Sequence, residues 1–219
     1  FSAAIPQQAP RILFVNRPNS PQSVVIAAQV LGVHGRDDLL ALRAANDVLG
    51  GNFLSRINTN LRETKGWSYG SSSRIGGQED RVSFRVIAPV QADKTGETIR
   101  EIQSDVNAFL TTRGVTAEEL ARTVNGSIRE LPGEFETAGS VLSGIQAIVQ
   151  LGRPDTYYEQ LADRYRAMTT ADLDTALRAQ VDPSHFVYIV VGDANIVQPQ
   201  LAGLGLPVET VDPATLGGQ

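Results

Sequence analysis

Apolar runs near both ends of the chain, separated by a long stretch with helical periodicity, set the strongest limit on its fold. Residues 12–15, 24–30 and 186–191 are rich in β-branched side chains and predict strands, the last of them a buried one. Residues 68–75 and 81–88 predict a hairpin, because apolar and polar side chains alternate in its second arm. This order predicts an α+β domain, in which helices pack on one face of a mixed or antiparallel sheet.

The middle of the chain has the spacing of amphipathic helices. Residues 37–49 predict one helix, and Asn52 is expected to cap a second. Phe53, Ile57 and Leu61 recur at helical spacing, so we expect them on the buried side of that second helix. Further helices are expected over residues 99–110, over residues 116–128 from a capping box of Thr116 and Glu119, and over residues 134–151, 154–167 and 170–180.

The 219 residues are expected to form one domain. Hydrophobic residues make up 42% and charged residues 20%, which is typical of a globular protein with a sizeable core. Residues 1–10, which include Pro6 and Pro10, are expected to be a linker from a preceding part of a longer polypeptide. Residues 11–211 are then the domain and residues 212–219 a tail.

Charge and motif content exclude several classes of function. The formal net charge is −5 and no basic stripe is present, so nucleic acid is not an expected partner. The sequence has no phosphate-binding loop or dinucleotide fingerprint, and no apolar run long enough to predict a membrane span. The lack of cysteine excludes disulfides and thiol catalysis, and it fits the cytosol and a bacterial periplasm equally.

The sequence offers no set of metal ligands. His34 and His185 are its only histidines, and neither belongs to a metal-binding motif such as His-x-x-Glu-His. We interpret both as ordinary loop or edge residues. We therefore expect no metal, no cofactor and no catalytic residue in this chain.

Arg62 and Tyr69 are the candidate binding residues. The guanidinium group of Arg62 and the phenol of Tyr69 can both donate hydrogen bonds to a carbonyl oxygen. Arg62 follows Leu61 on the predicted helix and so flanks its buried side, and Tyr69 follows the turn after that helix. Taken alone, the two residues are better explained as an ordinary surface arginine and an ordinary strand tyrosine.

The surrounding segment adds a resemblance to a known family. Residues 49–57, LGGNFLSRI, and residues 61–69, LRETKGWSY, resemble the signature of the C-terminal, non-metal domain of the pitrilysin/insulinase family. These inverted zincins include mitochondrial processing peptidase. Residues 114–120, 168–173 and 187–193 resemble later segments of the same domain in the same order, so the likeness extends over about residues 11–211.

The resemblance implies a fold of the LuxS/processing-peptidase type and a function shared between two halves. In that family two homologous domains face each other as a clamshell, and the other half binds zinc through His-x-x-Glu-His. This chain would then be the substrate-binding half of a zinc-dependent peptidase, inert alone, with Arg62 and Tyr69 positioning the peptide substrate. Zinc is expected in the partner domain or subunit.

Two alternatives remain open. The chain could be a non-catalytic structural or peptide-binding subunit of the same fold, in which Arg62 and Tyr69 have no catalytic consequence. It could also be a free-standing ligand-binding domain with no role in proteolysis.

Overall fold

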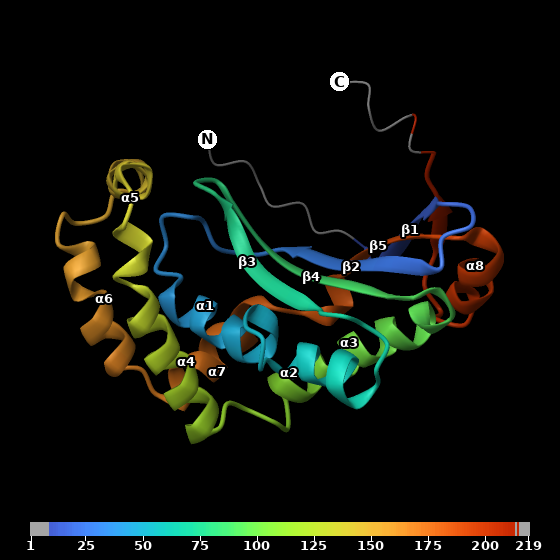
Figure 1. Ribbon diagram of the computed structural model, residues 1–219, viewed down its shortest axis with the longest axis horizontal. Coiled ribbons are helices and arrows are strands. Elements are labelled where there is room, and N and C mark those ends of the chain that lie inside the picture. Colours follow the sequence, from blue (N-terminus) through green and yellow to red (C-terminus); the bar gives the residue numbers. More distant parts are fainter. Residues whose placement is uncertain (1–8, 213, 215–219) are drawn as a thin grey trace.

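A computed structural model of the chain describes residues 9–212 and residue 214 (Figure 1). Within these residues one mixed sheet has the strand order β3-β4-β2-β5-β1-β6. The strands are β1 (Arg11–Asn16), β2 (Gln22–Val30), β3 (Ser72–Gln78), β4 (Arg81–Gln91), β5 (Val187–Gly192) and β6 (Val208–Thr210). The β2–β4, β3–β4 and β2–β5 pairs are antiparallel, and β1 runs parallel to both β5 and β6.

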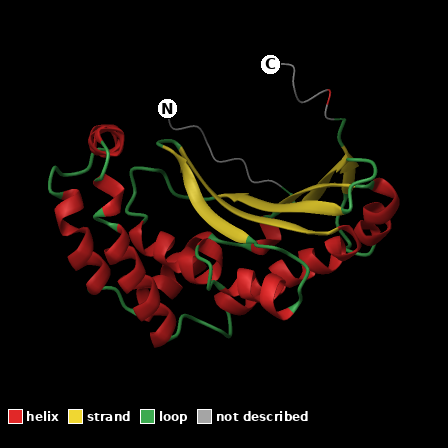
Figure 2. Ribbon diagram, viewed as in Figure 1, coloured by secondary structure: helices red, strands yellow, loops and turns green. Residues whose placement is uncertain are grey.

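The helices gather along one face of the sheet, and α5 and α6 lie beyond its β3 end (Figures 1 and 2). They are α1 (Leu40–Asn46), α2 (Arg56–Asn58), α3 (Thr95–Leu110), α4 (Ala117–Glu130), α5 (Ala138–Leu151), α6 (Tyr157–Arg166), α7 (Thr170–Gln180) and α8 (Ala194–Ala202). Two π-helical segments, η1 (Asp47–Gly51) and η2 (Thr59–Thr64), continue α1 and α2, and η3 (Ala92–Lys94), η4 (Gly133–Phe135) and η5 (Pro183–His185) are short 3₁₀ turns. The predicted α+β class is confirmed.

The two faces of the sheet differ in burial because side chains alternate along each strand. The face toward the helices is fully buried and includes Phe14, Val25, Phe84, Val86 and Tyr188. The opposite face is only half-buried, although Leu13, Val24, Ile26 and Ile189 on it are apolar. The prediction of a buried strand at residues 186–191 therefore holds for one face of β5 only.

The segment before α2 folds differently from the prediction. Helix α2 begins at Arg56 with Ser55 as its N-cap residue, so Asn52 does not cap it. Instead the side-chain oxygen of Asn52 accepts a hydrogen bond from the backbone N–H of Leu54 at 2.9 Å and forms a turn. Phe53 thus lies outside the helix and is 66% exposed, contrary to its predicted burial, whereas Ile57 and Leu61 are fully buried as predicted.

The first helix also starts later than predicted, at Leu40 instead of residue 37. Asp37 and Asp38 precede it, and their carboxylates accept hydrogen bonds from the backbone N–H groups of His34 and Leu40. Side-chain bonds of this kind compete with helix formation. The helices at the predicted capping box and at Thr170–Gln180 begin where the sequence predicts.

The predicted division into linker, domain and tail stays a prediction. Of the predicted linker, residues 1–8 lie outside the described residues, as do residues 213 and 215–219 of the predicted tail. Among the described helices, none is both long and apolar enough to cross a membrane.

Candidate functional site

Arg62 lies in η2, which is held in place by the buried side chains of Ile57 and Leu61. Its side chain is 31% exposed, and its guanidinium carbon lies 4.5 Å from the centroid of the Phe53 ring. Nη1 of Arg62 is 3.3 Å from a carboxylate oxygen of Glu63, but it makes no hydrogen bond of good geometry within the described residues. Nη1 is itself buried, so a ligand can reach only the exposed part of the side chain, which stacking on Phe53 orients.

The turn that follows η2 is fixed by backbone contacts. The carbonyl oxygen of Leu61 accepts hydrogen bonds from the N–H groups of Trp67 and Ser68, at 3.0 and 3.3 Å. Gly66 has a φ of 68°, a left-handed conformation that glycine adopts without steric cost. The chain therefore reverses direction directly after the helix, before Tyr69.

Both sides of Tyr69 are tied to the body of the domain. The hydroxyl of Ser68 donates to the carbonyl oxygen of Pro89 at 2.6 Å, and the side-chain oxygen of Asn58 accepts from the N–H of Ser71 at 2.9 Å. Tyr69 itself is 94% exposed. A rigid loop thus presents the phenol to solvent.

The structure does not bring Arg62 and Tyr69 into contact. A side chain as exposed as that of Tyr69 makes no substantial packing contact, whereas Arg62 stacks on Phe53. Tyr69 lies in the loop and not in a strand, because β3 begins only at Ser72. Their joint role in binding a peptide stays a prediction.

The two glycines before this region differ in how strictly packing requires them, because a Cβ at Gly50 would meet backbone and one at Gly51 would meet only side-chain ends. A Cβ at Gly50 would come 2.3 Å from Oγ of Ser73 and 2.9 Å from its backbone nitrogen. A Cβ at Gly51 would come 2.2 Å from Oδ1 of Asp47. Gly50 therefore allows η1 to pack on β3, and Gly51 leaves room for the Asp47 carboxylate.

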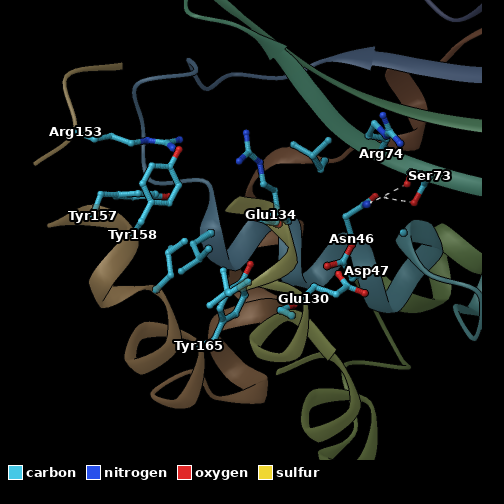
Figure 3. A pocket seen from close by; sticks show the side chains of 17 residues that line it. Asn46, Asp47, Ser73, Arg74, Glu130, Glu134, Arg153, Tyr157, Tyr158 and Tyr165 are labelled. Carbon is cyan, nitrogen blue, oxygen red and sulfur yellow. Dashed lines mark hydrogen bonds between the residues drawn. The ribbon is translucent and has the colours of Figure 1, made fainter. Parts of the chain in front are cut away.

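Sequence reasoning missed a cavity of about 430 Å³ between the α1–η1 segment, β3, α4 and α6 (Figure 3). Its lining includes Asn46, Asp47, Arg74, Glu130, Tyr158 and Tyr165. Asn46 is buried, and its side chain exchanges hydrogen bonds with Ser73 of β3 at 2.6 and 3.2 Å. The signal in the sequence was an acidic residue, Asp47, near the C-terminal end of the helix predicted over residues 37–49.

Asp47 is the perturbed carboxyl group of this cavity. Burial raises its pKa to about 6, the charge of Glu130 adds to the increase, and the charge of Arg43 partly offsets it. A second cavity of about 480 Å³ shares Asp47, Gly51 and Glu130 with the first and extends to Phe53. The Phe53 ring, on which Arg62 stacks, is therefore part of the wall of this second cavity.

The sequence matches the family described as "Peptidase M16 inactive domain" over residues 1–127. The chain belongs to this family. The predicted relationship to the non-metal domain of the pitrilysin-like peptidases is thereby confirmed. No curated protein matches the chain.

Solved structures share the fold of this M16 inactive domain. The peptidase M16 inactive domain from Pseudomonas fluorescens has a TM-score of 0.74 and 23% identity, over 87% of this chain and 46% of that one. A putative zinc protease from Bordetella pertussis Tohama I has a TM-score of 0.65 and 18% identity, over 77% of this chain and 93% of that one. A chain of Complex III2 from Candida albicans has a TM-score of 0.69 and 13% identity, over 90% of this chain and 49% of that one. The chain thus spans less than half the length of the Pseudomonas protein.

The histidines of this M16 domain serve local turns. Nδ1 of His34 lies 3.7 Å from Asp37, and Nδ1 of His185 lies 3.3 Å from Asp182, with both imidazoles well exposed. Within residues 9–212 and 214, no group of three or more His, Asp or Glu side chains could hold a metal ion.

Proposed function

We propose that this chain is the substrate-binding half of a zinc-dependent peptidase. Arg62 and Tyr69 would donate hydrogen bonds to a bound peptide, and a partner domain or subunit with His-x-x-Glu-His would carry the zinc. The observation that supports this best is the fixed loop that presents Tyr69 to solvent close in sequence to the half-exposed Arg62. Such a loop loses little conformational freedom when it binds a ligand.

Hydrogen-bond donors are what this half can contribute to the reaction. Hydrolysis of a peptide bond places negative charge on its carbonyl oxygen, and zinc held by the partner would activate the attacking water. Donors held in position near that oxygen stabilise the transition state, and removal of one typically costs about 10²–10³ in kcat. Arg62 offers a permanent charge, and Tyr69 a neutral phenol.

Two features support a partner half. The chain spans 46% of the Pseudomonas fluorescens protein that shares its fold. It also leaves Leu142, Ile145 and Val149 exposed on α5. Large apolar side chains gathered in this way commonly mark an interaction surface.

Kinetics of the reconstituted pair test the proposal. In the complex with the zinc-bearing partner, Arg62→Ala and Tyr69→Phe should each lower kcat/KM for a quenched peptide by about 10- to 1000-fold. Thermal unfolding of both variants should stay close to that of the parent chain. Arg166→Ala is the matched control, since Arg166 forms an exposed ion pair with Asp163. Unchanged kinetics in both site variants would contradict the proposal.

A second candidate is a non-catalytic assembly subunit. The likeness to a chain of Complex III2 from Candida albicans favours it, because that structure is described as a complex and not as a peptidase. The two candidates differ in one measurement. If the chain, its metal-bearing partner and zinc together hydrolyse no member of a quenched peptide library, the assembly role replaces the peptidase role.

A further inference from the structure

Strand β3 forms one edge of the sheet, and part of that edge is open. Within the described residues β3 pairs with β4 alone, on one side only. The edge is covered at its start, because Nδ2 of Asn46 donates to the carbonyl oxygen of Ser73 and a Cβ at Gly50 would meet the Ser73 nitrogen. The open part of the edge therefore lies beyond Ser73.

The hydrogen bonds of β3 show which backbone groups face outward. The carbonyl oxygen of Ser73 accepts from Asn46 of α1 at 3.2 Å and so is directed away from β4. The carbonyl oxygen of Gly76 is directed toward β4, where Oγ of Ser83 donates to it at 3.1 Å. Backbone groups alternate in direction along an antiparallel strand, so the N–H and C=O groups of Ile75 and Gly77 face away from β4. Within the part of the chain that is described, no other element bonds to these four groups.

Gly77 leaves the backbone at this edge accessible. A Cβ at this position would meet the carbonyl oxygen of Arg81, so the position requires glycine. Gly77 is exposed, and since it has no side chain, its exposed surface is backbone. Unpaired backbone groups at a sheet edge are a template for the addition of a further strand.

Two cavities lie along the open edge. The first cavity, of about 430 Å³, is lined by Ile75, and a third cavity, of about 440 Å³, is lined by Gly77. Arg43 lines both, so the two cavities are neighbours along β3, and we call them together the β3 groove. Each has a volume within the range of ligand-binding cavities, about 300–1,000 Å³.

The far wall of the β3 groove limits what can enter it. Tyr158 and Leu161 of α6 and Ala147 and Leu151 of α5 form this wall, and Figure 1 shows both helices beyond the β3 edge. A single added strand lies about 4.8 Å from its neighbour and so needs little width. The β3 edge of a second copy would bring its own α5 and α6 against these helices. The groove therefore favours one extended chain over a second copy of this domain.

Charge does not select the occupant of the β3 groove. Arginine and acidic side chains both line the first cavity, and Glu79 of the third is paired with Arg36. Recognition therefore depends on the backbone. In strand addition main-chain hydrogen bonds give the affinity, and the side chains of the added strand contribute specificity.

We propose that an extended segment of a peptide binds in the β3 groove as a further strand of the sheet, bonded to the N–H and C=O groups of Ile75 and Gly77. This rests on the proposed function, because the occupant is the peptide that Arg62 and Tyr69 would position. Strand β3 begins at Ser72, three residues after Tyr69, so a peptide held at Tyr69 can continue along β3.

Amide hydrogen exchange of the full chain, followed by NMR, tests the proposal without the partner. The probe is the pentapeptide acetyl-Thr-Val-Thr-Val-Thr amide, which has strand-forming side chains and no charge. At a peptide concentration about ten times its Kd, exchange at the amides of Ile75 and Gly77 should slow about tenfold. The amides of Arg74 and Gly76, which face β4, should exchange at an unchanged rate.

A backbone analogue and a pair of variants are the controls. The analogue with esters in place of the internal amides keeps the side chains but loses the N–H donors, so it should bind at least about tenfold more weakly. Ala147→Trp fills the groove from α5 and should weaken the pentapeptide about tenfold. Gln146→Trp places the same side chain at an exposed position of α5 outside the groove and should leave its affinity unchanged.

Three results would each overturn the proposal. The first is no binding of the pentapeptide, since recognition through the backbone does not depend on a particular side chain. The second is binding that leaves exchange at Ile75 and Gly77 unchanged. The third is equal affinity for the pentapeptide and its ester analogue. The exchange measurement uses the unaltered chain, so it stays decisive even if Ala147→Trp folds poorly.

Tyr69→Phe separates this proposal from the proposed function. It should lower peptide turnover in the reconstituted pair but leave binding of the pentapeptide to the chain alone unchanged. If the Arg62 and Tyr69 variants keep full turnover while the pentapeptide still slows exchange at Ile75, the positioning role fails and strand addition stands. If those variants lose turnover while exchange at Ile75 and Gly77 stays unchanged, strand addition fails and the positioning role stands.

Discussion

At the scale of single residues, Asp47 has the clearest consequence for stability. Its pKa is about 6 in the folded chain, above the ordinary value of 3.8, chiefly because of burial and then of Glu130. An acid with a raised pKa binds its proton more tightly in the folded state. The ionisation of Asp47 therefore costs no stability well below pH 3.8, costs increasingly more from pH 3.8 to about pH 6, and has its full cost above about pH 6. We predict that Asp47→Asn raises the free energy of unfolding by about 1–3 kcal/mol at pH 7, and that the gain disappears near pH 4.

Urea unfolding at the two pH values measures this gain. Glu118→Gln, at an exposed position on α4, should stay within about 0.5 kcal/mol of the parent chain at both. If Asp47→Asn is no more stable than the parent chain at pH 7, the ionisation of Asp47 does not lower the stability of the fold as predicted.

The sequence predicted the burial of some residues correctly and of others wrongly, depending on whether the signal was local. Helical spacing predicted the burial of Ile57 and Leu61, because that signal is local. Phe53 has the same spacing, but the turn formed by Asn52 excludes it from the helix. The approach of Asp47 to Glu130 depends on how α4 packs on η1, which no local pattern encodes.

At the scale of elements, one buried ion pair joins α2 to the start of α4. Nε and Nη2 of Arg56 donate to the two carboxylate oxygens of Glu119 at 2.8 and 2.7 Å, and Nη2 also donates to the carbonyl oxygen of Gly114. The two side chains are 11% and 15% exposed. We predict that Arg56→Ala lowers the free energy of unfolding by about 3–5 kcal/mol, since it leaves a buried charge unpaired. Denaturant unfolding measures the loss, and Arg166→Ala, which breaks an exposed pair, should cost under about 1 kcal/mol.

The same pair predicts a dependence on pH. Burial opposes the ionisation of Glu119, but hydrogen bonds from Arg56 and Thr116 outweigh it and lower its pKa to about 2. A depressed pKa gives stability that is complete above the ordinary value of 4.5 and is lost as the pH falls toward 2. The stability difference between the parent chain and Glu119→Gln should therefore be largest at pH 7 and narrow steadily from pH 4.5 to pH 3. A difference that stays constant over that range would show that Glu119 acts through shape alone.

Element boundaries were predictable where a side chain fixes them. Thr116 and Glu119 form both hydrogen bonds of the predicted capping box. The sheet order β3-β4-β2-β5-β1-β6 was not predictable, because β1 pairs with β5 across almost the whole chain. The half-exposed outer face of β5 follows from that order, since helices cover only one side.

At the scale of the whole molecule, apolar surface remains uncovered within the described residues. The outer face of the sheet carries half-exposed Leu13, Ile26 and Ile189, and α5 exposes Leu142 and Val149. Apolar surface of this extent usually contacts something else. The proposed partner half would cover such surface, and the position of the loop that carries Tyr69 relative to that half can be measured.

Trp67, the single tryptophan of the chain, is the probe for that measurement. Its backbone N–H donates to the carbonyl oxygen of Leu61, and its backbone carbonyl oxygen accepts from the backbone N–H of Gln91, both at 3.0 Å. The amino groups of Lys65 and Lys94 lie 5.2 and 5.6 Å from the ring centroid. The indole is thus held firmly in the turn that leads to Tyr69, so a change in its environment reports on what reaches that loop.

We predict that the single ¹⁹F resonance of the chain labelled with 5-fluorotryptophan shifts when the zinc-bearing partner and a slowly hydrolysed peptide are added together. The label distinguishes this indole from any tryptophan of the partner. An unrelated zinc peptidase at the same concentration should leave the resonance unchanged. If peptide is hydrolysed by the pair while the resonance keeps its position and width, the loop that carries Tyr69 does not face the substrate, and peptide positioning belongs to another part of the domain.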